Sequence, residues 1–161
     1  GRKDLMEILN PGYGKDYLAL SGTFSGNPVT MTAGLATLKL YNKDEIDRIN
    51  GLGDRLKNGL KREAEKNGLP LTITGCGSLL GLNYTEKKII NGRDAYSAML
   101  ENAPFRRCVH LAAVNKGYYM MEKGRMVVST AMTEEIIDRT IEDFGGIFTM
   151  CKPVYDELEI G

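Results

Sequence analysis

The sequence predicts an α+β fold in which a small, mostly antiparallel sheet carries helices packed on one face. Two long segments repeat apolar residues at helical spacing. Between them lies the run LTITGCGSLLGLNY, which has the composition of strands interrupted by glycine. The predicted order is helix, helix, two strands, helix, hairpin and helix. With 161 residues, the chain is long enough for one domain with an appendage and can bury a core without disulfides.

The first 43 residues divide into an irregular stretch and a helix. Residues 1–26 are rich in glycine and tyrosine without a sustained period, so we expect them to pack on another surface. Asn27 is a favourable helix cap, and Pro28 suits the first helical position. From there to Asn42, one helical face carries small and apolar residues, namely Val29, Ala33, Ala36 and Leu40.

Residues 44–150 are expected to form a small C-terminal α+β domain that holds the core. Its long helix begins at Asp44 and ends at Asn67-Gly68. The apolar stripe of this helix consists of Ile46, Ile49, Leu52 or Gly53, Leu56, Leu60 and Ala64. Strands are predicted at 71–74 and 78–84, separated by a bend at Gly75 and Gly77. Residues 85–103 are polar and poorly patterned, which predicts a mobile loop.

The remaining elements of this domain follow in a short space. A helix is predicted from Pro104 to Lys116, and then a hairpin that pairs 118–121 with 125–130 around a Glu-Lys-Gly turn. Thr133 caps a final helix whose buried face carries Ile137, Ile141, Phe144 and Phe148. Because it contains Pro153, the segment 151–161 is expected to be a loose tail.

The composition argues against several classes of protein. The 21 basic and 21 acidic side chains cancel, whereas a nucleic-acid or membrane-surface partner favours a basic excess. No apolar run approaches the roughly 20 residues that span a bilayer. The three cysteines are widely spaced, which fits a reducing compartment better than a disulfide framework or a zinc site. We therefore expect a cytoplasmic protein without a bound metal.

A glycine-flanked loop before the first long helix is the strongest candidate site. Gly22 and Gly26 leave backbone N–H groups unobstructed, a helix N-terminus follows, and hydroxyl donors are added by Ser21, Thr23 and Ser25. Together these features suit a phosphate group. An ordinary flexible connection with a capped helix explains the same residues. The loop lacks the Lys-Ser/Thr pair that a nucleotide-binding P-loop requires.

No catalytic set emerges from the remaining residues. His110 is the only histidine, and Cys108, two positions away, lies on a different helical face, which argues against a Cys–His couple. The carboxylates lie on solvated helix faces. Arg125 begins a strand after a glycine turn, where it either binds a carboxylate bidentately or forms a surface ion pair.

Several segments resemble the class III pyridoxal-phosphate aminotransferases, a family that includes the glutamate-semialdehyde aminomutases and the β-amino-acid aminotransferases. SGTFSGNPVTMTAGLATLKLY is similar to the segment joining the large and small domains of these enzymes. LTITGCGSLLGLNYTE resembles the first strands of their small domain, and CVHLAAVNKGYYMMEKGRMVVSTAMTEEIIDRTIEDF resembles its closing elements. The resemblance implies the C-terminal domain of a fold type I pyridoxal-phosphate enzyme.

The resemblance also implies a role for the loop. In the family, the Gly-Thr of this loop donates hydrogen bonds to the cofactor phosphate of the neighbouring subunit of a homodimer. Gly22 and Thr23 are then the cofactor-binding residues, with Ser21 beside them. Arg125 lies close to the position of an arginine that binds a substrate carboxylate in some β-amino-acid aminotransferases.

The family's cofactor-binding lysine belongs to sequence upstream of anything present here. The resemblance therefore implies a C-terminal part of an aminotransferase or aminomutase, without its large catalytic domain and inactive alone. Residues 1–43 are then a remnant of the large-domain surface, the phosphate loop and a connecting helix. The parent enzyme is expected to move an amino group between a small amino acid and a keto or aldehyde acceptor. The alternative is a free-standing α+β module that binds a phosphorylated ligand or a protein partner.

Overall fold

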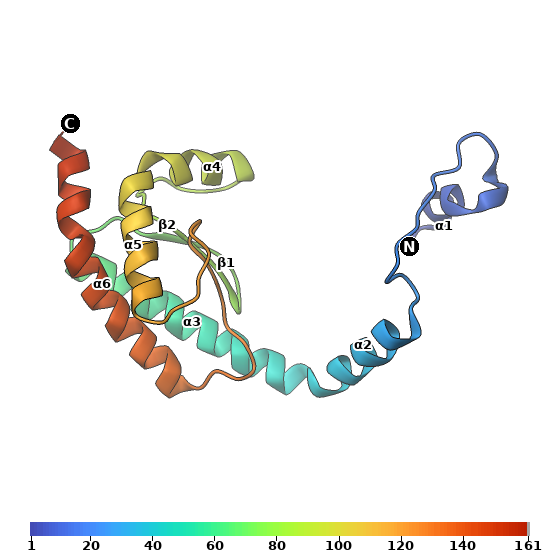
Figure 1. Ribbon diagram of the computed structural model, residues 1–161, viewed down its shortest axis with the longest axis horizontal. Helices are drawn as coiled ribbons and strands as arrows, with labels where there is room; N and C mark the ends of the chain where they lie inside the picture. The colour runs from blue at the N-terminus through green and yellow to red at the C-terminus, as the bar shows by residue number, and fades with distance from the viewer. Residues whose placement is uncertain (161) are drawn as a thin grey trace. The chain divides into compact units, whose positions relative to one another are not determined.

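The computed structural model describes residues 1–160 and divides the chain into two compact units, Gly1–Asn42 and Lys43–Gly161. Its helices, 3-10 turns and strands follow one another as α1 (Lys3–Met6), η1 (Glu7–Leu9), η2 (Pro11–Tyr13), α2 (Pro28–Leu40), α3 (Lys43–Lys66), β1 (Thr72–Cys76), β2 (Leu79–Asn83), α4 (Gly92–Glu101), α5 (Ala103–Asn115), β3 (Arg125–Val127) and α6 (Glu134–Ile160). Figure 1 shows these elements along the chain.

The unit Gly1–Asn42 has no core of its own. None of its residues is buried, and its short turns α1, η1 and η2 lead into an extended stretch before α2. The predicted cap of α2 is confirmed, because the Asn27 side chain accepts hydrogen bonds from the N–H groups of Val29 (2.9 Å) and Thr30 (3.3 Å). The predicted apolar face of α2 is exposed, with 77% of Val29 and 78% of Leu40 accessible.

The second unit is built on the packing of α6 against α3 and α5 (Figure 1). Apolar residues of α3 recur every three or four positions, so one face of the helix is buried along its length. The buried face of α3 consists of Ile49, Leu52, Gly53, Leu56, Gly59, Leu60 and Ala64. Gly59 permits close contact with α6, because a Cβ there would lie 2.2 Å from Cδ1 of Ile141.

Aromatic rings fill the centre of this unit. Tyr84, which follows β2, meets Phe105 of α5 edge to face with ring centroids 4.9 Å apart. Phe148 of α6 contacts both Tyr84 and Phe144 in the same manner, at 6.3 and 5.9 Å. Edge-to-face pairs of this kind add to the free energy gained from burying the rings. The core therefore joins the sheet to α5 and α6.

The sheet has three antiparallel strands in the order β1-β2-β3. Leu82 pairs with Ile73 of β1, and Leu80 pairs with Met126 of β3. Gly75 and Gly77, predicted to bend the chain, both have positive φ angles, of 115° and 53°. These observations confirm the predicted α+β class with a small antiparallel sheet.

The predicted hairpin between 118–121 and 125–130 is wrong. Residues 118–121 form no strand, and β3 pairs with β2 instead. The N–H of Leu82 donates to the carbonyl of Gly124 (2.9 Å), and the N–H of Val128 donates to the carbonyl of Ser78 (2.8 Å). The edge of β2 thus satisfies the polar backbone groups that the hairpin would have used.

Two further expectations differ from the structure. The predicted mobile loop at 85–103 contains α4, which is capped by Asn91. The predicted loose tail is a continuation of α6 through residues 151–160, and Gly161 lies outside the described residues. Cys151 and Tyr155 remain on the buried face of that helix, so packing holds the helix past Pro153.

Candidate functional site

The loop predicted to bind phosphate is a solvent-exposed turn. Every residue from Ser21 to Gly26 is exposed. The N–H of Ser25 donates to the carbonyl of Gly22 (3.0 Å), which closes the turn, and Gly26 leaves it with φ of 68°. A Cβ on Gly22 would lie 3.0 Å from Oγ of Ser25, a close contact that rotation of the serine side chain can relieve. Gly22 and Thr23 belong to this turn, and Ser21 directly precedes it.

Several hydrogen-bond donors of this loop have no partner within the protein. Among residues 1–160, the N–H groups of Gly22, Thr23 and Phe24 have no hydrogen-bond partner, and neither have the hydroxyls of Ser21 and Thr23. Because these donors are adjacent and exposed, they can converge on one anion. A phosphate oxygen accepts hydrogen bonds of this kind from backbone and hydroxyl groups.

The N-terminus of α2 contributes less than the sequence predicted. Pro28 has no N–H, and the side chain of Asn27 already occupies the N–H groups of Val29 and Thr30. The unpaired donors that normally make a helix start an anion site are therefore used. The partial positive charge of the helix remains, and no carboxylate side chain occurs in the sequence between Asp16 and Asp44 to oppose an anion.

Arg125 lies at a second candidate position, in the unit Lys43–Gly161. It is the first residue of β3, where it pairs with Gly81, and its side chain is exposed. No ion pair or side-chain hydrogen bond joins this guanidinium to any residue in the described part of the chain, so the surface ion pair considered from sequence does not form. A guanidinium without a protein partner is available to bind a carboxylate through two parallel hydrogen bonds.

Arg125 lines an apolar cavity of about 500 Å³. Four methionines line this cavity, namely Met120, Met121, Met126 and Met132. Its wall also includes Tyr118, Tyr119 and Ile137. Methionine side chains are flexible and polarizable, so such a wall adapts to ligands of different shape. One cationic group at the edge of an apolar space suits a ligand that has a carboxylate and an apolar body.

A buried arginine fixes the turn that precedes Arg125. Arg106 of α5 is 8% exposed, and its Nη1 donates to the carbonyl (2.9 Å) and to Oε1 (2.8 Å) of Glu122. The Arg106 guanidinium holds the pKa of Glu122 below its usual range. Gly124 closes the turn with φ of 76°, and a Cβ there would lie 2.5 Å from the carbonyl oxygen of Leu82. The turn at Gly124 was predicted from sequence, but the contacts with Arg106 and Leu82 were not, since they join distant segments.

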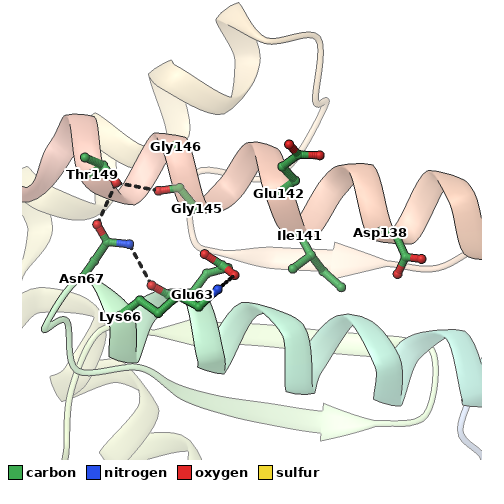
Figure 2. A pocket seen from close by; sticks show the side chains of 9 residues that line it. All are labelled: Glu63, Lys66, Asn67, Asp138, Ile141, Glu142, Gly145, Gly146 and Thr149. Atoms are coloured by element: carbon green, nitrogen blue, oxygen red, sulfur yellow. Dashed lines mark hydrogen bonds and ion pairs between the residues drawn. The ribbon is translucent and has the colours of Figure 1, made fainter.

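The groove between α3 and α6 in Figure 2 is polar, and most of its side chains bond to one another. Thr149 donates to Oδ1 of Asn67 (2.8 Å), and Asn67 donates to the carbonyl of Glu63 (2.8 Å). Lys66 pairs with the Glu63 carboxylate at 2.6 Å. Only the Thr149–Asn67 bond joins the two helices, and the other two lie at the end of α3. Because these polar groups already have partners, the groove is a poor candidate for a ligand site.

The remaining reactive residues form no catalytic set. Nδ1 of His110 is buried without a hydrogen-bond partner, and no nucleophile is recorded as bonded to it within residues 1–160. Across the same residues, no cluster of histidine, cysteine, aspartate and glutamate has the arrangement of a metal site. No helix in the described part of the chain has the length and apolar character needed to cross a membrane.

Comparison with known proteins gives one consistent result. A family model described as aminotransferase class-III matches residues 1–151. Glutamate-1-semialdehyde 2,1-aminomutase 2 of Bacillus pumilus (strain SAFR-032) is 36% identical over 150 residues, and the match covers 92% of this chain and 34% of that protein. The glutamate-1-semialdehyde 2,1-aminomutase of Bacillus subtilis (strain 168) is 33% identical over 150 residues, covering 92% and 34%.

Solved structures show the same relationship. An omega-transaminase from Sphaerobacter thermophilus aligns with a TM-score of 0.77 at 25% identity, covering 94% of this chain and 34% of that one. A β-phenylalanine aminotransferase from Variovorax paradoxus aligns with a TM-score of 0.76 at 28% identity, covering 91% and 33%. The chain thus spans about a third of the length of the relatives it matches.

Proposed function

This chain belongs to the class III aminotransferase family, and on that premise we propose that it is the C-terminal part of a pyridoxal-phosphate-dependent aminotransferase or aminomutase. The single observation that carries the proposal is the exposed turn Ser21–Gly26 with its unpaired donors. Its sequence resembles the family's phosphate loop, and its geometry leaves those donors free for a ligand. The chain's coverage of one third of its relatives supports an origin in a longer enzyme.

Class III aminotransferases use pyridoxal phosphate, and the turn fits the phosphate of that cofactor. The N–H groups of Gly22 and Thr23, with the hydroxyls of Thr23 and Ser21, would donate to the phosphate oxygens. When bound, the cofactor supplies the carbonyl carbon and electron-withdrawing ring needed for amino transfer. The residues of this chain contribute binding and orientation.

Arg125 is proposed to bind the carboxylate of the substrate. Its guanidinium has no protein partner among the described residues, and it lies at the edge of the methionine-lined cavity. A substrate with a carboxylate and an apolar side chain satisfies both the charge and the cavity wall, whereas a short polar substrate would leave the wall exposed. We therefore favour an apolar amino acid as the amino donor.

A complete site requires protein that this chain does not contain. The lysine that holds the cofactor in the family would come from a large domain, and the cofactor phosphate would come from the second subunit of a homodimer. Exposed apolar side chains on the unit Gly1–Asn42 support such partners, among them Leu20, Phe24, Val29, Leu38 and Leu40, each at least 69% accessible. Apolar surface on this scale is normally covered by other protein.

The proposed role of the loop in cofactor binding is tested by replacing Thr23 with alanine in the full-length enzyme that contains this chain. Removing a hydroxyl that donates to a charged phosphate costs about 1.5–3 kcal/mol, so the dissociation constant for pyridoxal phosphate should rise roughly ten- to a hundredfold. Thr30→Ala is the matched control, because its side chain lies beyond the turn and has no recorded bond within residues 1–160. Equal affinities for Thr23→Ala and the parent would exclude the loop from the cofactor site.

The dependence on a large domain is tested with the 161-residue chain alone. Mixed with pyridoxal phosphate and reduced with borohydride, it should acquire no stoichiometric adduct on a single lysine and should not turn over an amino donor. An adduct on one lysine, together with turnover, would show that the chain is an enzyme in itself. Tight binding of inorganic phosphate without turnover would instead identify a free-standing binding module.

A further inference from the structure

Two cysteines face each other across the contact between α5 and α6. Sγ of Cys108 lies 2.9 Å from Sγ of Cys151, although 43 positions separate them in sequence. Cys151 is fully buried and Cys108 is half-buried. A disulfide has an S–S distance of about 2.05 Å, so the two sulfur atoms need to approach by less than about 1 Å. The packing of α5 against α6 therefore places the two sulfur atoms next to each other.

We propose that Cys108 and Cys151 are an oxidisable pair, which a low-molecular-weight disulfide such as oxidised glutathione converts to an intramolecular disulfide joining α5 to α6. The third cysteine has a different environment. Cys76 is exposed at the end of β1, and it has no sulfur neighbour in the part of the chain that the structure describes. Cys76 can therefore carry a mixed disulfide with glutathione, but it cannot complete the intramolecular reaction.

The reaction proceeds by two exchanges. The thiolate of Cys108 attacks one sulfur of the oxidant, forms a mixed disulfide and releases one thiolate, which takes up a proton. Cys151 then loses its proton to solvent or to the released thiolate. Its sulfur attacks Sγ of Cys108 and expels the second small thiol. Overall, two protein thiols lose two hydrogen atoms, and one disulfide molecule is reduced to two thiols.

The order of attack follows from accessibility. Burial, together with the adjacent Cys108, raises the pKa of the Cys151 thiol to about 12. A buried thiol with a raised pKa is a poor first nucleophile, and the oxidant reaches the half-buried Cys108 more easily. Cys151 reacts in the second exchange because its sulfur lies next to the mixed disulfide, where proximity compensates for the small thiolate fraction.

The segment closed by this bond contains the candidate substrate site. The residues between the two cysteines include β3, Arg125 and every residue lining the apolar cavity except Leu56. A bond between helices that already pack together constrains the unfolded chain more than the native one. Oxidation should therefore stabilise this half of the unit, and the midpoint of thermal unfolding should rise by roughly 5–10 °C.

The experiment uses the 161-residue chain with Cys76→Ser, so that only the pair can react. The chain is incubated with oxidised glutathione and then with dithiothreitol, and each form is examined by intact mass, thiol alkylation and thermal unfolding. We expect a mass lower by two hydrogens, no alkylatable thiol, and a proteolytic peptide in which residues 108 and 151 are linked. The raised unfolding midpoint should return to its original value on reduction.

Cys76→Ser combined with Cys108→Ser, or with Cys151→Ala, provides the matched controls, in which glutathione should raise no midpoint. The principal measurement is made on Cys76→Ser alone, so it does not depend on either double variant folding. Three outcomes would each overturn the proposal: both thiols remain alkylatable in the folded oxidised sample, Cys108 stops at the glutathione adduct, or the disulfide forms between two chains.

Discussion

Two glycines of α3, two positions apart, have opposite surroundings. A Cβ on Gly53 would lie 2.2 Å from the carbonyl oxygen and 2.8 Å from the carbonyl carbon of Gly77, whereas a Cβ on Gly51 meets nothing within 4 Å. Gly53 therefore sets how closely α3 approaches the turn between β1 and β2. The clash is with backbone atoms, so no side-chain rotation relieves it.

Gly53→Ala should lower the free energy of unfolding by about 1–3 kcal/mol, because the turn at Gly77 must shift to admit the methyl group. Gly51→Ala is the matched control. It should raise the free energy of unfolding by up to about 1 kcal/mol, since alanine has the higher helix propensity and the site is open. Urea denaturation measures both effects. Equal shifts in the two variants would contradict the observed packing.

Asp143 of α6 gives the stability a defined pH dependence. Its carboxylate accepts hydrogen bonds from Nζ of Lys116 (2.8 Å) and from the hydroxyl of Tyr118 (2.5 Å). First the Lys116 bond and then the Tyr118 bond hold the pKa of Asp143 below its usual value. A lowered carboxyl pKa stabilises the fold above the unfolded-state pKa of about 3.9, and this stabilisation is lost as pH falls through the lower native pKa.

Asp143→Asn should therefore be less stable than the parent chain at pH 7, and the difference should shrink as pH falls below about 4. Denaturation midpoints measured from pH 7 to pH 2.5 test this expectation. Glu142→Gln, one residue away on the exposed side, should show a small difference throughout the range because no bond to Glu142 is recorded within residues 1–160. A difference for Asp143→Asn that grows toward low pH would contradict the assignment.

The stability of helix α4 depends on the residues at its N-terminus. Oδ1 of Asn91 accepts from the N–H groups of Arg93 (2.9 Å) and Asp94 (3.0 Å). Oδ2 of Asp94 accepts in turn from the N–H of Ile90 (3.1 Å). The two side chains thus form a reciprocal cap. Since the helix has only ten residues and buries only Ala98, this cap is a large part of what defines it.

Asn91→Ala should cost about 1 kcal/mol, and the loss should be concentrated in α4. Hydrogen exchange of the backbone amides of Arg93, Asp94 and Ala95 should accelerate, while exchange in α3 stays unchanged. Asn91→Ser keeps an oxygen that can accept the same bonds, so it should retain most of the protection. Protection in Asn91→Ala equal to that of the parent would show that packing, and not the cap, holds the helix.

The elements that sequence reasoning placed well are those whose signal is local and strong. The stripe of α3 predicted its buried face, because the helix packs along its whole length and periodicity records that packing. The start of α2 was predicted correctly from Asn27. Its signal is local, because a capping side chain bonds to N–H groups only two and three positions away.

The wrong predictions concern elements that depend on contacts with distant segments, with one exception, helix α4, whose capping residues are visible in the sequence. The hairpin at 118–130 does not form because β3 pairs with β2, a strand about 45 residues earlier in the sequence, and not with residues 118–121. Pro153 was expected to end α6, but burial of Cys151 and Tyr155 keeps the helix intact beyond it. The Asn91–Asp94 cap is a local signal, and it could have identified α4 inside the supposed loop.

In the candidate site, too, the features that depend on local sequence could be predicted and those that depend on distant contacts could not. The exposed donors around Gly22 could be anticipated because glycine and serine open a loop to solvent. The occupation of the helix start by Asn27 could have been anticipated too, since a capping side chain uses the very N–H groups that an anion would need. The apolar cavity beside Arg125 could not, because its wall combines residues from α3, α6 and the segment between α5 and β3.

The two units of the chain differ in how they are stabilised. Among the residues whose burial is described, 1–158, the buried apolar ones lie between Ile49 and Tyr155, and none lies in residues 1–42. Helix α2 is apolar around its circumference and only 13 residues long, so its own hydrogen bonds cannot keep it folded in water. The stability measured for the chain should therefore come from the unit Lys43–Gly161.

Removing residues 1–42 should change the free energy of unfolding by no more than about 0.5 kcal/mol, because the deletion takes no side chain out of a core. It should also reduce self-association, since the deleted segment carries exposed apolar side chains such as Leu20, Phe24 and Leu40. Paired denaturation curves and sedimentation velocity at several concentrations measure the two effects. Phe24→Ser with Leu40→Ser in the full chain is the control, because it lowers the apolar surface without shortening the chain. A truncated chain that unfolds at much lower urea would show that residues 1–42 belong to the folding unit, and the exposed apolar surface would then need another explanation.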